Sequence, residues 1–158
     1  MSCSVWQLDV MKKVVYCIDE FEPVRGIPER LDSIKTSRYF PHRNRMVVTG
    51  DASAPRDAFR ANQTYYTAIK QGLALGTHQM KVAKRNMEHT DSRLLCNWII
   101  RNWDFCIDPR CVQMLADLQG TETTPDGRID KKAHDPHFAD TMRYLFQNIL
   151  YKDLKHIL

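Results

Sequence analysis

The sequence predicts an α/β fold in which helices flank a mixed β-sheet. Two short runs of β-branched and aromatic residues, 4–8 and 14–18, open the chain and predict a pair of strands. Beyond them, segments with helical spacing alternate with short apolar runs, which is typical of a sheet with helices on its faces. The length of 158 residues predicts one domain, residues 1–158, large enough to bury a core.

The first half of the chain alternates between strands and helices. Residues 9–13 connect the opening strands as a hairpin, although they lack an Asn-Gly turn. Apolar spacing over 27–39 predicts a short amphipathic helix. The continuous apolar residues of 45–49 predict a buried strand, and a polar loop over 51–62 follows it.

The middle of the chain contains two predicted helices and a short strand candidate. Residues 64–75 have helical spacing, and Gly76 supplies a stop signal. Residues 80–83 are the strand candidate. Thr90 or Asp91 is placed to cap the next helix.

The last third of the chain is mainly helical. An apolar run at 105–107 precedes a helix over 108–118 that Asp-Pro opens. A polar stretch with a turn at 125–127 leads to the final helix. Its apolar stripe from Phe138 to Leu150 predicts a core-facing surface.

The composition is typical of a soluble intracellular protein. The formal net charge of +4 permits a nucleic-acid partner without implying one. No apolar run reaches membrane-spanning length, and the N-terminus lacks the apolar stretch of a signal peptide, so we expect no membrane partner. Five irregularly spaced cysteines predict buried reduced thiols.

Asp51, directly after the strand predicted at 45–49, is the first candidate site residue. Chemistry in open α/β sheets gathers outside the strand ends, so its carboxylate is placed to bind a metal ion. Its small neighbours Gly50 and Ala52 leave room for a bulky substrate. The alternative is an Asp that caps the next turn through backbone N–H groups.

Asp135, His137 and Asp140 form a second group of candidates at the start of the final helix. His137 and Asp140 are three residues apart and share one helical face. Alternatively, Asp140 favours the helix dipole and His137 is a polar first-turn residue. Without a matched cysteine or second histidine cluster, a hard ion such as Mg²⁺ or Mn²⁺ is expected rather than Zn²⁺. Acids presented from a strand end and a helix suit a metal-dependent phosphodiesterase.

Lysines and arginines flank the polar segments around these candidates. As DNA-binding residues they would contact the phosphate backbone without reading its sequence. The alternative is a solvated surface. The candidates are Arg56, Arg60, Lys84, Arg85, Lys131 and Lys132.

Two common enzyme signatures are missing from the sequence. No G-x-x-x-x-G-K-[ST] motif occurs, which excludes a P-loop ATPase in this chain. Ser53 does not lie in a nucleophile elbow, so we do not expect a serine hydrolase.

Ordered motifs across nearly the whole chain resemble the C-terminal nuclease domain of tailed-bacteriophage terminase large subunits. Each motif is short, and their order and spacing together carry the resemblance. The motifs are Tyr16-Cys17-Ile18-Asp19-Glu20, Val47-Val48-Thr49-Gly50-Asp51-Ala52-Ser53, Lys84-Arg85-Asn86, Leu94 to Trp98, Ile107-Asp108-Pro109-Arg110-Cys111, Leu115-Ala116-Asp117-Leu118, Asp126-Gly127, Asp130-Lys131-Lys132 and His137-Phe138-Ala139-Asp140-Thr141-Met142-Arg143-Tyr144.

This resemblance implies an RNase H-like fold and metal-dependent endonuclease cleavage of concatemeric double-stranded DNA during genome packaging. Asp51 and Asp140 would be metal ligands, Asp135 a further candidate, and His137 an auxiliary ligand or proton-transfer group. Two Mg²⁺ or Mn²⁺ ions about 3.5–4 Å apart would activate water and stabilise the leaving 3′ oxygen. The implied partners are double-stranded DNA, the terminase ATPase motor portion, the small terminase subunit and the portal protein. The implied location is the cytoplasm of a prokaryotic host.

The chain departs from the family pattern at its beginning. The family's first catalytic acid lies on a first strand, whereas this chain begins at the counterpart of the second strand. We therefore expect a partial domain, weak or inactive alone, whose missing strand and Asp come from a complementary upstream chain. Asp9 lies in the hairpin connection, and Asp19 and Glu20 lie at the far end of the next strand, so none replaces that acid readily.

Two alternatives to a packaging endonuclease stay open. One is a catalytically inactive DNA-binding or packaging-machine module that retains the fold. The other is a different RNase H-like nuclease, such as a resolvase, which the ordered motifs fit less well.

Overall fold

The computed structural model describes residues 1–53, 64–122, 124 and 135–154. The chain divides into two compact units. Unit 1 consists of Met1 and Pro23–Asn86, and unit 2 consists of Ser2–Glu22 and Met87–Leu158. The single domain expected from the chain length stays a prediction.

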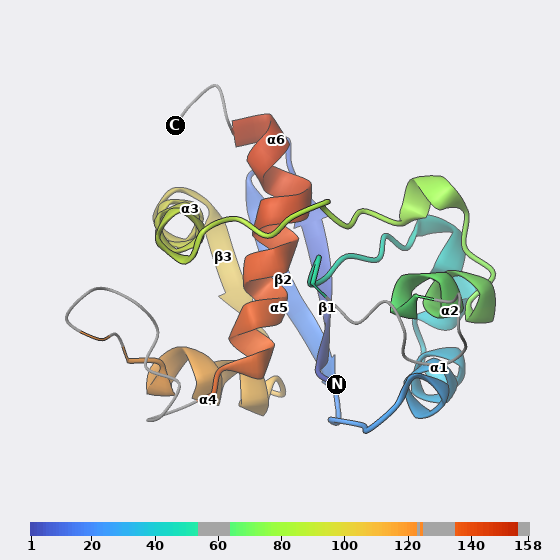
Figure 1. Ribbon diagram of the computed structural model, residues 1–158. Helices are drawn as coiled ribbons and strands as arrows, with labels where there is room; N and C mark the ends of the chain where they lie inside the picture. Colours follow the sequence, from blue (N-terminus) through green and yellow to red (C-terminus); the bar gives the residue numbers. More distant parts are fainter. Residues whose placement is uncertain (54–63, 123, 125–134, 155–158) are drawn as a thin grey trace. The chain divides into compact units, whose positions relative to one another are not determined.

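A mixed β-sheet forms the centre of unit 2 (Figure 1). Strand β1 (Cys3–Asp9) pairs antiparallel with β2 (Val14–Phe21), and β2 pairs parallel with β3 (Asp104–Ile107). Val15 and Cys17 on β2 are fully buried, because alternate residues of a strand point to the same face of the sheet. The predicted hairpin and the mixed sheet are confirmed.

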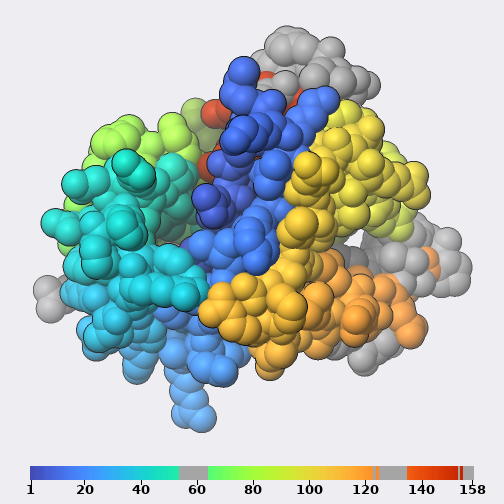
Figure 2. All heavy atoms as spheres, turned by 180° about the vertical axis from the view of Figure 1, so that it is seen from behind, coloured from blue at the N-terminus to red at the C-terminus, as the bar shows by residue number. Residues whose placement is uncertain are grey.

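Helices cover one face of this sheet. They are α3 (His89–Asn102), α4 (Val112–Gly120) and α5 (His137–Leu145), and α5 crosses that face in Figure 1. Helix α5 continues directly into a π turn, η3 (Phe146–Leu150), and the short helix α6 (Tyr151–Leu154). Figure 2 views the opposite side, where atoms of the strands reach the surface. The final helix is confirmed, but nothing in the sequence indicated its π turn.

The core of unit 2 lies between the sheet and these helices. Trp6 on β1, Phe105 on β3 and Phe146 on η3 form an aromatic cluster with ring centroids 6.1 to 6.3 Å apart. The predicted apolar stripe of the final helix is buried at Phe138, Met142, Leu145, Phe146 and Leu150.

The described residues of unit 1 form two α-helices and two 3₁₀ helices. These are α1 (Ile27–Thr36), η1 (Phe40–Arg45), α2 (Tyr65–Gly72) and η2 (Thr77–Gln79). Gly72 lets α1 and α2 approach closely, since a Cβ at this position would lie 2.5 Å from a methyl group of Leu31. The predicted helices over 27–39 and 64–75 are therefore present, both in shortened form.

The strands predicted at 45–49 and 80–83 are reduced to a single parallel bridge between Val48 and Met80. The bridge is closed by Val48 N–H to Gln79 C=O and by Lys81 N–H to Val48 C=O, both 2.8 Å. The side-chain amide of Gln79 donates to the carbonyls of Arg43 and Met46 over 2.7 and 2.8 Å. The Gln79 side chain thus occupies backbone carbonyls that would otherwise accept hydrogen bonds from a neighbouring strand.

Three predicted helix ends are wrong. Helix α4 begins at Val112 with Cys111 as its N-cap residue, so Asp108-Pro109 does not open it. Helix α2 ends before Gly76, because Ala74 adopts a left-handed φ of 53° and Leu75 N–H closes back on Lys70 C=O over 2.9 Å. Helix α3 begins at His89 without a side-chain cap, so neither Thr90 nor Asp91 caps it. The turn at 125–127 and most of the loop over 51–62 lie outside the described residues.

The cysteines are reduced, as the sequence predicts. Among the described residues, which include all five cysteines, no disulfide forms. Cys17, Cys96 and Cys111 are buried as predicted, whereas Cys3 is partly exposed and Cys106 is exposed, so the predicted burial is wrong for these two. Burial raises the pKa of the Cys96 thiol to about 12. No helix in the described part of the chain combines the length and apolar character needed to cross a membrane.

Candidate functional site

Asp51 in unit 1 lies just beyond the bridge between Val48 and Met80. Its Oδ1 accepts hydrogen bonds from the backbone N–H and the hydroxyl of Ser53, both over 2.7 Å. These bonds form an Asx turn, so the turn-capping role considered from the sequence is present. The half-buried carboxylate of Asp51 is therefore oriented by hydrogen bonds within its own turn, without a ligand.

Asn86 is a site residue that sequence reasoning missed. Its Nδ2 donates to Asp51 Oδ1 over 2.6 Å, and its Oδ1 accepts the backbone N–H of Ala52 over 2.9 Å. The sequence offered two signals, its place in the motif Lys84-Arg85-Asn86 and its position a few residues beyond the strand candidate at 80–83, but neither gave it a role. Its contact with Asp51 bridges 35 residues of sequence.

Tyr66 fixes the backbone of the same turn. Its hydroxyl donates to the carbonyl of Asp51 over 2.8 Å. The approach requires a glycine at position 50, because a Cβ there would lie 2.5 Å from the Tyr66 hydroxyl oxygen. The small neighbour expected to leave room for substrate thus makes room for Tyr66.

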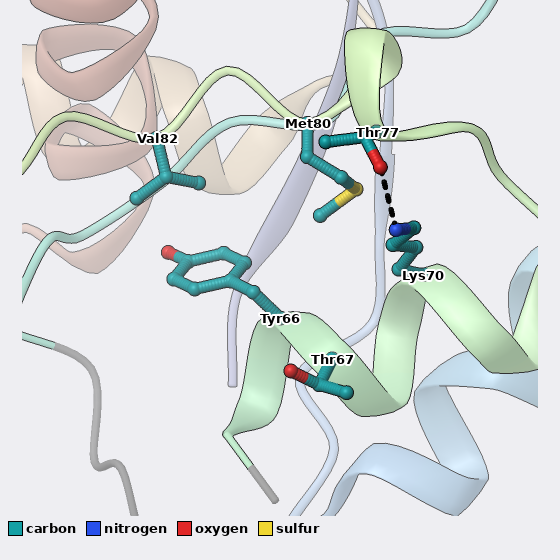
Figure 3. A pocket seen from close by; sticks show the side chains of 6 residues that line it. All are labelled: Tyr66, Thr67, Lys70, Thr77, Met80 and Val82. Atoms are coloured by element: carbon teal, nitrogen blue, oxygen red, sulfur yellow. Dashed lines mark hydrogen bonds between the residues drawn. The ribbon is translucent and has the colours of Figure 1, made fainter.

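Tyr66 also lines a pocket of about 240 Å³ within unit 1 (Figure 3). Tyr66, Thr67 and Lys70 extend into it from α2, and the Lys70 ammonium donates to the Thr77 hydroxyl over 2.7 Å. The pocket is lined by Tyr66, Thr67, Lys70, Thr77, Met80 and Val82.

Asp140 in unit 2 lies in the first turn of α5 and is paired with Arg143. Its Oδ1 accepts from Arg143 Nε over 3.0 Å and lies 2.9 Å from a terminal guanidinium nitrogen. The pair is largely buried, with 18% of the Asp140 side chain and 9% of the Arg143 side chain exposed. A guanidinium therefore already compensates this carboxylate.

His137 and Asp135 form a more exposed pair before the same turn. His137 Nε2 lies 3.5 Å from Asp135 Oδ2, with 67% and 47% of the two side chains exposed. His137 and Asp140 thus have different partners, and their joint approach to one metal ion stays a prediction. An imidazole this exposed is accessible to a ligand or to proton exchange with water.

Asp117 is a second residue that sequence reasoning did not single out. Its Oδ2 accepts the backbone N–H groups of Phe138 and Ala139 at the start of α5, over 2.6 and 3.1 Å. Asp117 is itself only 6% exposed. The start of α5 is therefore capped from α4. Asp140 lies in the same first turn, where the alternative role at the helix dipole places it.

The predicted DNA-binding cations are described only in part. Lys84 and Arg85 are exposed and directly precede Asn86. Arg56, Arg60, Lys131 and Lys132 lie outside the described residues.

Within the described residues, no three His, Cys, Asp or Glu side chains gather in a group that could hold a metal ion. Asp51 belongs to unit 1, whereas Asp135, His137 and Asp140 belong to unit 2. Carboxylates and an imidazole are nevertheless suitable donors for a hard divalent cation. These four assignments stay predictions.

Comparison with known proteins supports the fold. No family model matches the chain, and no curated protein matches it in sequence. The structure is similar to the nuclease domain of the large terminase of bacteriophage SPP1, which was solved with bound Mn. The match has 20% sequence identity and a TM-score of 0.58, and covers 90% of this chain and 75% of that chain. This similarity confirms the predicted RNase H-like fold, with its mixed sheet and flanking helices.

Proposed function

We propose that the chain is a metal-dependent DNA endonuclease domain of a phage packaging terminase, acting on concatemeric double-stranded DNA. The observation that carries the proposal is the fold similarity to the SPP1 large terminase nuclease domain, which extends over 90% of this chain. The described part of the chain supplies three carboxylates and a histidine of the kind such chemistry uses, Asp51, Asp135, Asp140 and His137.

In this function Asp51, Asp140 and Asp135 hold Mg²⁺ or Mn²⁺ in a two-ion site. The Mn bound to the SPP1 domain supports a divalent ion of this class. When bound, the ions would activate water and compensate charge on the scissile phosphate. Exposed His137, near Asp135, is suited to exchange a proton with the nucleophile or the leaving group.

DNA is held through its phosphates. Exposed Lys84 and Arg85 follow the bridged segment that leads to Asn86, and Arg56, Arg60, Lys131 and Lys132 add positive charge from segments outside the described residues. Phosphate contacts of this kind bind without reading sequence. The protein partners follow from the resemblance to terminases. They are the ATPase motor portion, the small terminase subunit and the portal protein, in the cytoplasm of the host cell.

A plasmid assay tests the proposal. Supercoiled plasmid is incubated with Mn²⁺ and the wild-type chain, Asp51→Asn or Asp140→Asn, each with an EDTA control. As expected from the sequence, Mn²⁺-dependent cleavage by the wild-type chain alone should be weak, and it should fall about 100-fold or more in both variants, because each loses a charged ligand of the ions.

Asn102→Ala serves as the matched control for handling and folding, since its amide contacts only an exposed helix carbonyl of Trp98 in the bonds described for it. Cleavage that survives in Asp51→Asn and Asp140→Asn at the wild-type rate would assign the activity to a contaminant or another site. The endonuclease proposal would then fail.

A DNA-binding module without nuclease activity is the second candidate. The observation that favours it is the ion pair between Asp140 and Arg143, because a carboxylate already neutralised by a guanidinium is a poorer metal ligand. Equal plasmid binding by wild type and Asp140→Asn in a gel-shift assay, with no Mn²⁺-dependent cleavage by either, would support this module over the enzyme.

A further inference from the structure

We propose that Asn86 is a positioning residue for Asp51, whose side-chain amide holds the Asp51 carboxylate in the orientation that binds the divalent cation. This inference rests on the proposed function, because it assigns a role at the same metal site. It concerns the contacts that Asn86 makes within unit 1.

The orientation of the Asn86 amide follows from its two neighbours. The backbone N–H of Ala52 can only donate, so the atom that faces it, 2.9 Å away, must be the amide oxygen. The other end of the amide is then the NH₂ group, which lies 2.6 Å from Asp51 Oδ1 and donates to it. One planar side chain therefore fixes both the carboxylate of Asp51 and the backbone of the next residue.

The parallel bridge explains why Asn86 reaches this turn. Val48 lies opposite Met80, so the segments that follow these two residues start side by side and run in the same direction. Asp51 is three residues beyond Val48, and Asn86 is six residues beyond Met80. The two bonds of Asn86 join the segments again at the point where the candidate ligand lies.

The chemistry of an amide suits this position. Ser53 also donates to Asp51 Oδ1, but it belongs to the same turn and moves with Asp51. Asn86 anchors the carboxylate to a different segment through a neutral amide, so this contact itself leaves the charge of Asp51 unchanged. A lysine or arginine here would compensate that charge, and an acid would repel it. Hydrogen-bonded neighbours of this kind orient metal ligands and tune their affinity.

The simpler reading is that Asn86 only links two segments of unit 1. Both readings predict a change in stability when the amide is removed. Only the positioning role predicts a change in cation affinity that exceeds the change in stability and that acts through Asp51.

Mn²⁺ affinity of the full chain distinguishes the two readings. Titration calorimetry compares wild type, Asn86→Ala, Asp51→Asn and the control Asn102→Ala, and thermal unfolding of each metal-free protein is recorded in parallel. We expect Asn86→Ala to weaken Mn²⁺ binding about 10- to 100-fold while remaining folded. Asp51→Asn should weaken binding at least as much, and Asn102→Ala should bind as wild type does.

The outcomes separate this inference from the proposed function. If Asp51→Asn loses affinity but Asn86→Ala binds as wild type does, the positioning role alone is overturned. If wild type fails to bind Mn²⁺, or if Asp51→Asn binds it unchanged, the metal site of the proposed function fails, and the role of Asn86 fails with it.

A spectroscopic measurement on the wild-type chain decides the case even if Asn86→Ala does not fold. The side-chain amide resonances of Asn86 are followed in ¹⁵N-labelled protein as Mg²⁺ is added. We expect them to shift in wild type and to remain unchanged in Asp51→Asn. Resonances that do not move in wild type at saturating Mg²⁺ would overturn the inference.

Discussion

Asp51 in unit 1 and Asp140 in unit 2 are held by opposite means. Asp51 accepts hydrogen bonds from neutral donors on Ser53 and Asn86. Asp140 accepts from the guanidinium of Arg143 in a largely buried ion pair. Both arrangements orient a carboxylate, and the Arg143 guanidinium also compensates the charge of Asp140. The difference teaches that a cation would meet at Asp51 a carboxylate oriented by neutral donors of Ser53 and Asn86, and would have to compete with Arg143 at Asp140.

The largest expected effect is on Mn²⁺ affinity. Asp51→Asn should weaken binding about 100-fold, because it removes a negatively charged ligand that Ser53 and Asn86 hold in place. Asp140→Asn should weaken it only about 10-fold, since part of its intrinsic affinity is already lost in competition with Arg143. Titration calorimetry of both variants measures the difference. Equal losses would show that the ion pair does not affect metal binding.

The next effect concerns what holds the start of α5. Asp117→Ala should lower the free energy of unfolding by about 2 kcal/mol, because two backbone N–H groups lose a buried charged acceptor. Urea denaturation monitored by circular dichroism gives this value.

Asp91→Ala is the control for this variant, since Asp91 lies in the first turn of α3 and makes no side-chain cap there. Its effect should stay within about 0.5 kcal/mol. A loss as large as that of Asp117→Ala would mean that the cap is not the cause.

Arg143→Gln removes the guanidinium that distinguishes the surroundings of Asp140 from those of Asp51. It should lower the free energy of unfolding by about 1.5 kcal/mol, because it leaves the largely buried Asp140 charge uncompensated. It also removes the guanidinium that lies 4.8 Å from the centre of the Tyr144 ring. Added Mn²⁺ should then raise the melting temperature more in Arg143→Gln than in wild type, since the competitor is gone. A smaller rise in Arg143→Gln than in wild type would show that Arg143 does not compete with the cation.

Gly50→Ala tests the rigidity of the Asp51 turn. The new Cβ meets the Tyr66 hydroxyl, so we expect a loss of about 1 kcal/mol in the free energy of unfolding. Tyr66→Phe removes the atom responsible for the clash. The loss in the double variant should therefore be smaller than the sum of the two single losses, and strict additivity would contradict the contact.

The smallest effect is a pH dependence at Cys96. Burial raises the pKa of this thiol to about 12 from an ordinary value of 9.0. The unfolded chain therefore loses the thiol proton first, and stability falls as pH rises above 9.0 towards 12. Between about pH 8 and about pH 9.5, wild type should lose less than about 1 kcal/mol more than Cys96→Ala in urea denaturation. Parallel slopes for the two proteins would contradict the raised pKa.

Much of the fold was predictable because its signals are local. The opening hairpin and the helices α1, α2, α4 and α5 each show the periodicity of their element within a few residues. The strand predicted at 45–49 failed for a non-local reason. The side chain of Gln79, more than 30 residues away, takes the carbonyls of Arg43 and Met46, and Val47 is 51% exposed.

The candidate site was predictable in its acids but not in their partners. Asp51 was indicated by its place after an apolar run, and Asp140 by its place at a helix start. Asn86 and Asp117 lie in motifs of the family resemblance, but their roles were missed, because an Asn or Asp in a sequence carries no sign of the distant group it will contact. Arg143 was visible three residues after Asp140, but the spacing alone does not say which charge it compensates.

The sequence by itself determined the order of elements, the apolar faces and the residues with metal-binding side chains. All three features depend on residue types and their spacing over a few positions, which can be read directly from the sequence. Only the tertiary structure decided that Asn86 holds Asp51, that Asp117 caps α5 and that Arg143 pairs with Asp140. Such choices depend on which groups lose water together when the chain folds, and in two of these three cases the groups lie more than 20 residues apart.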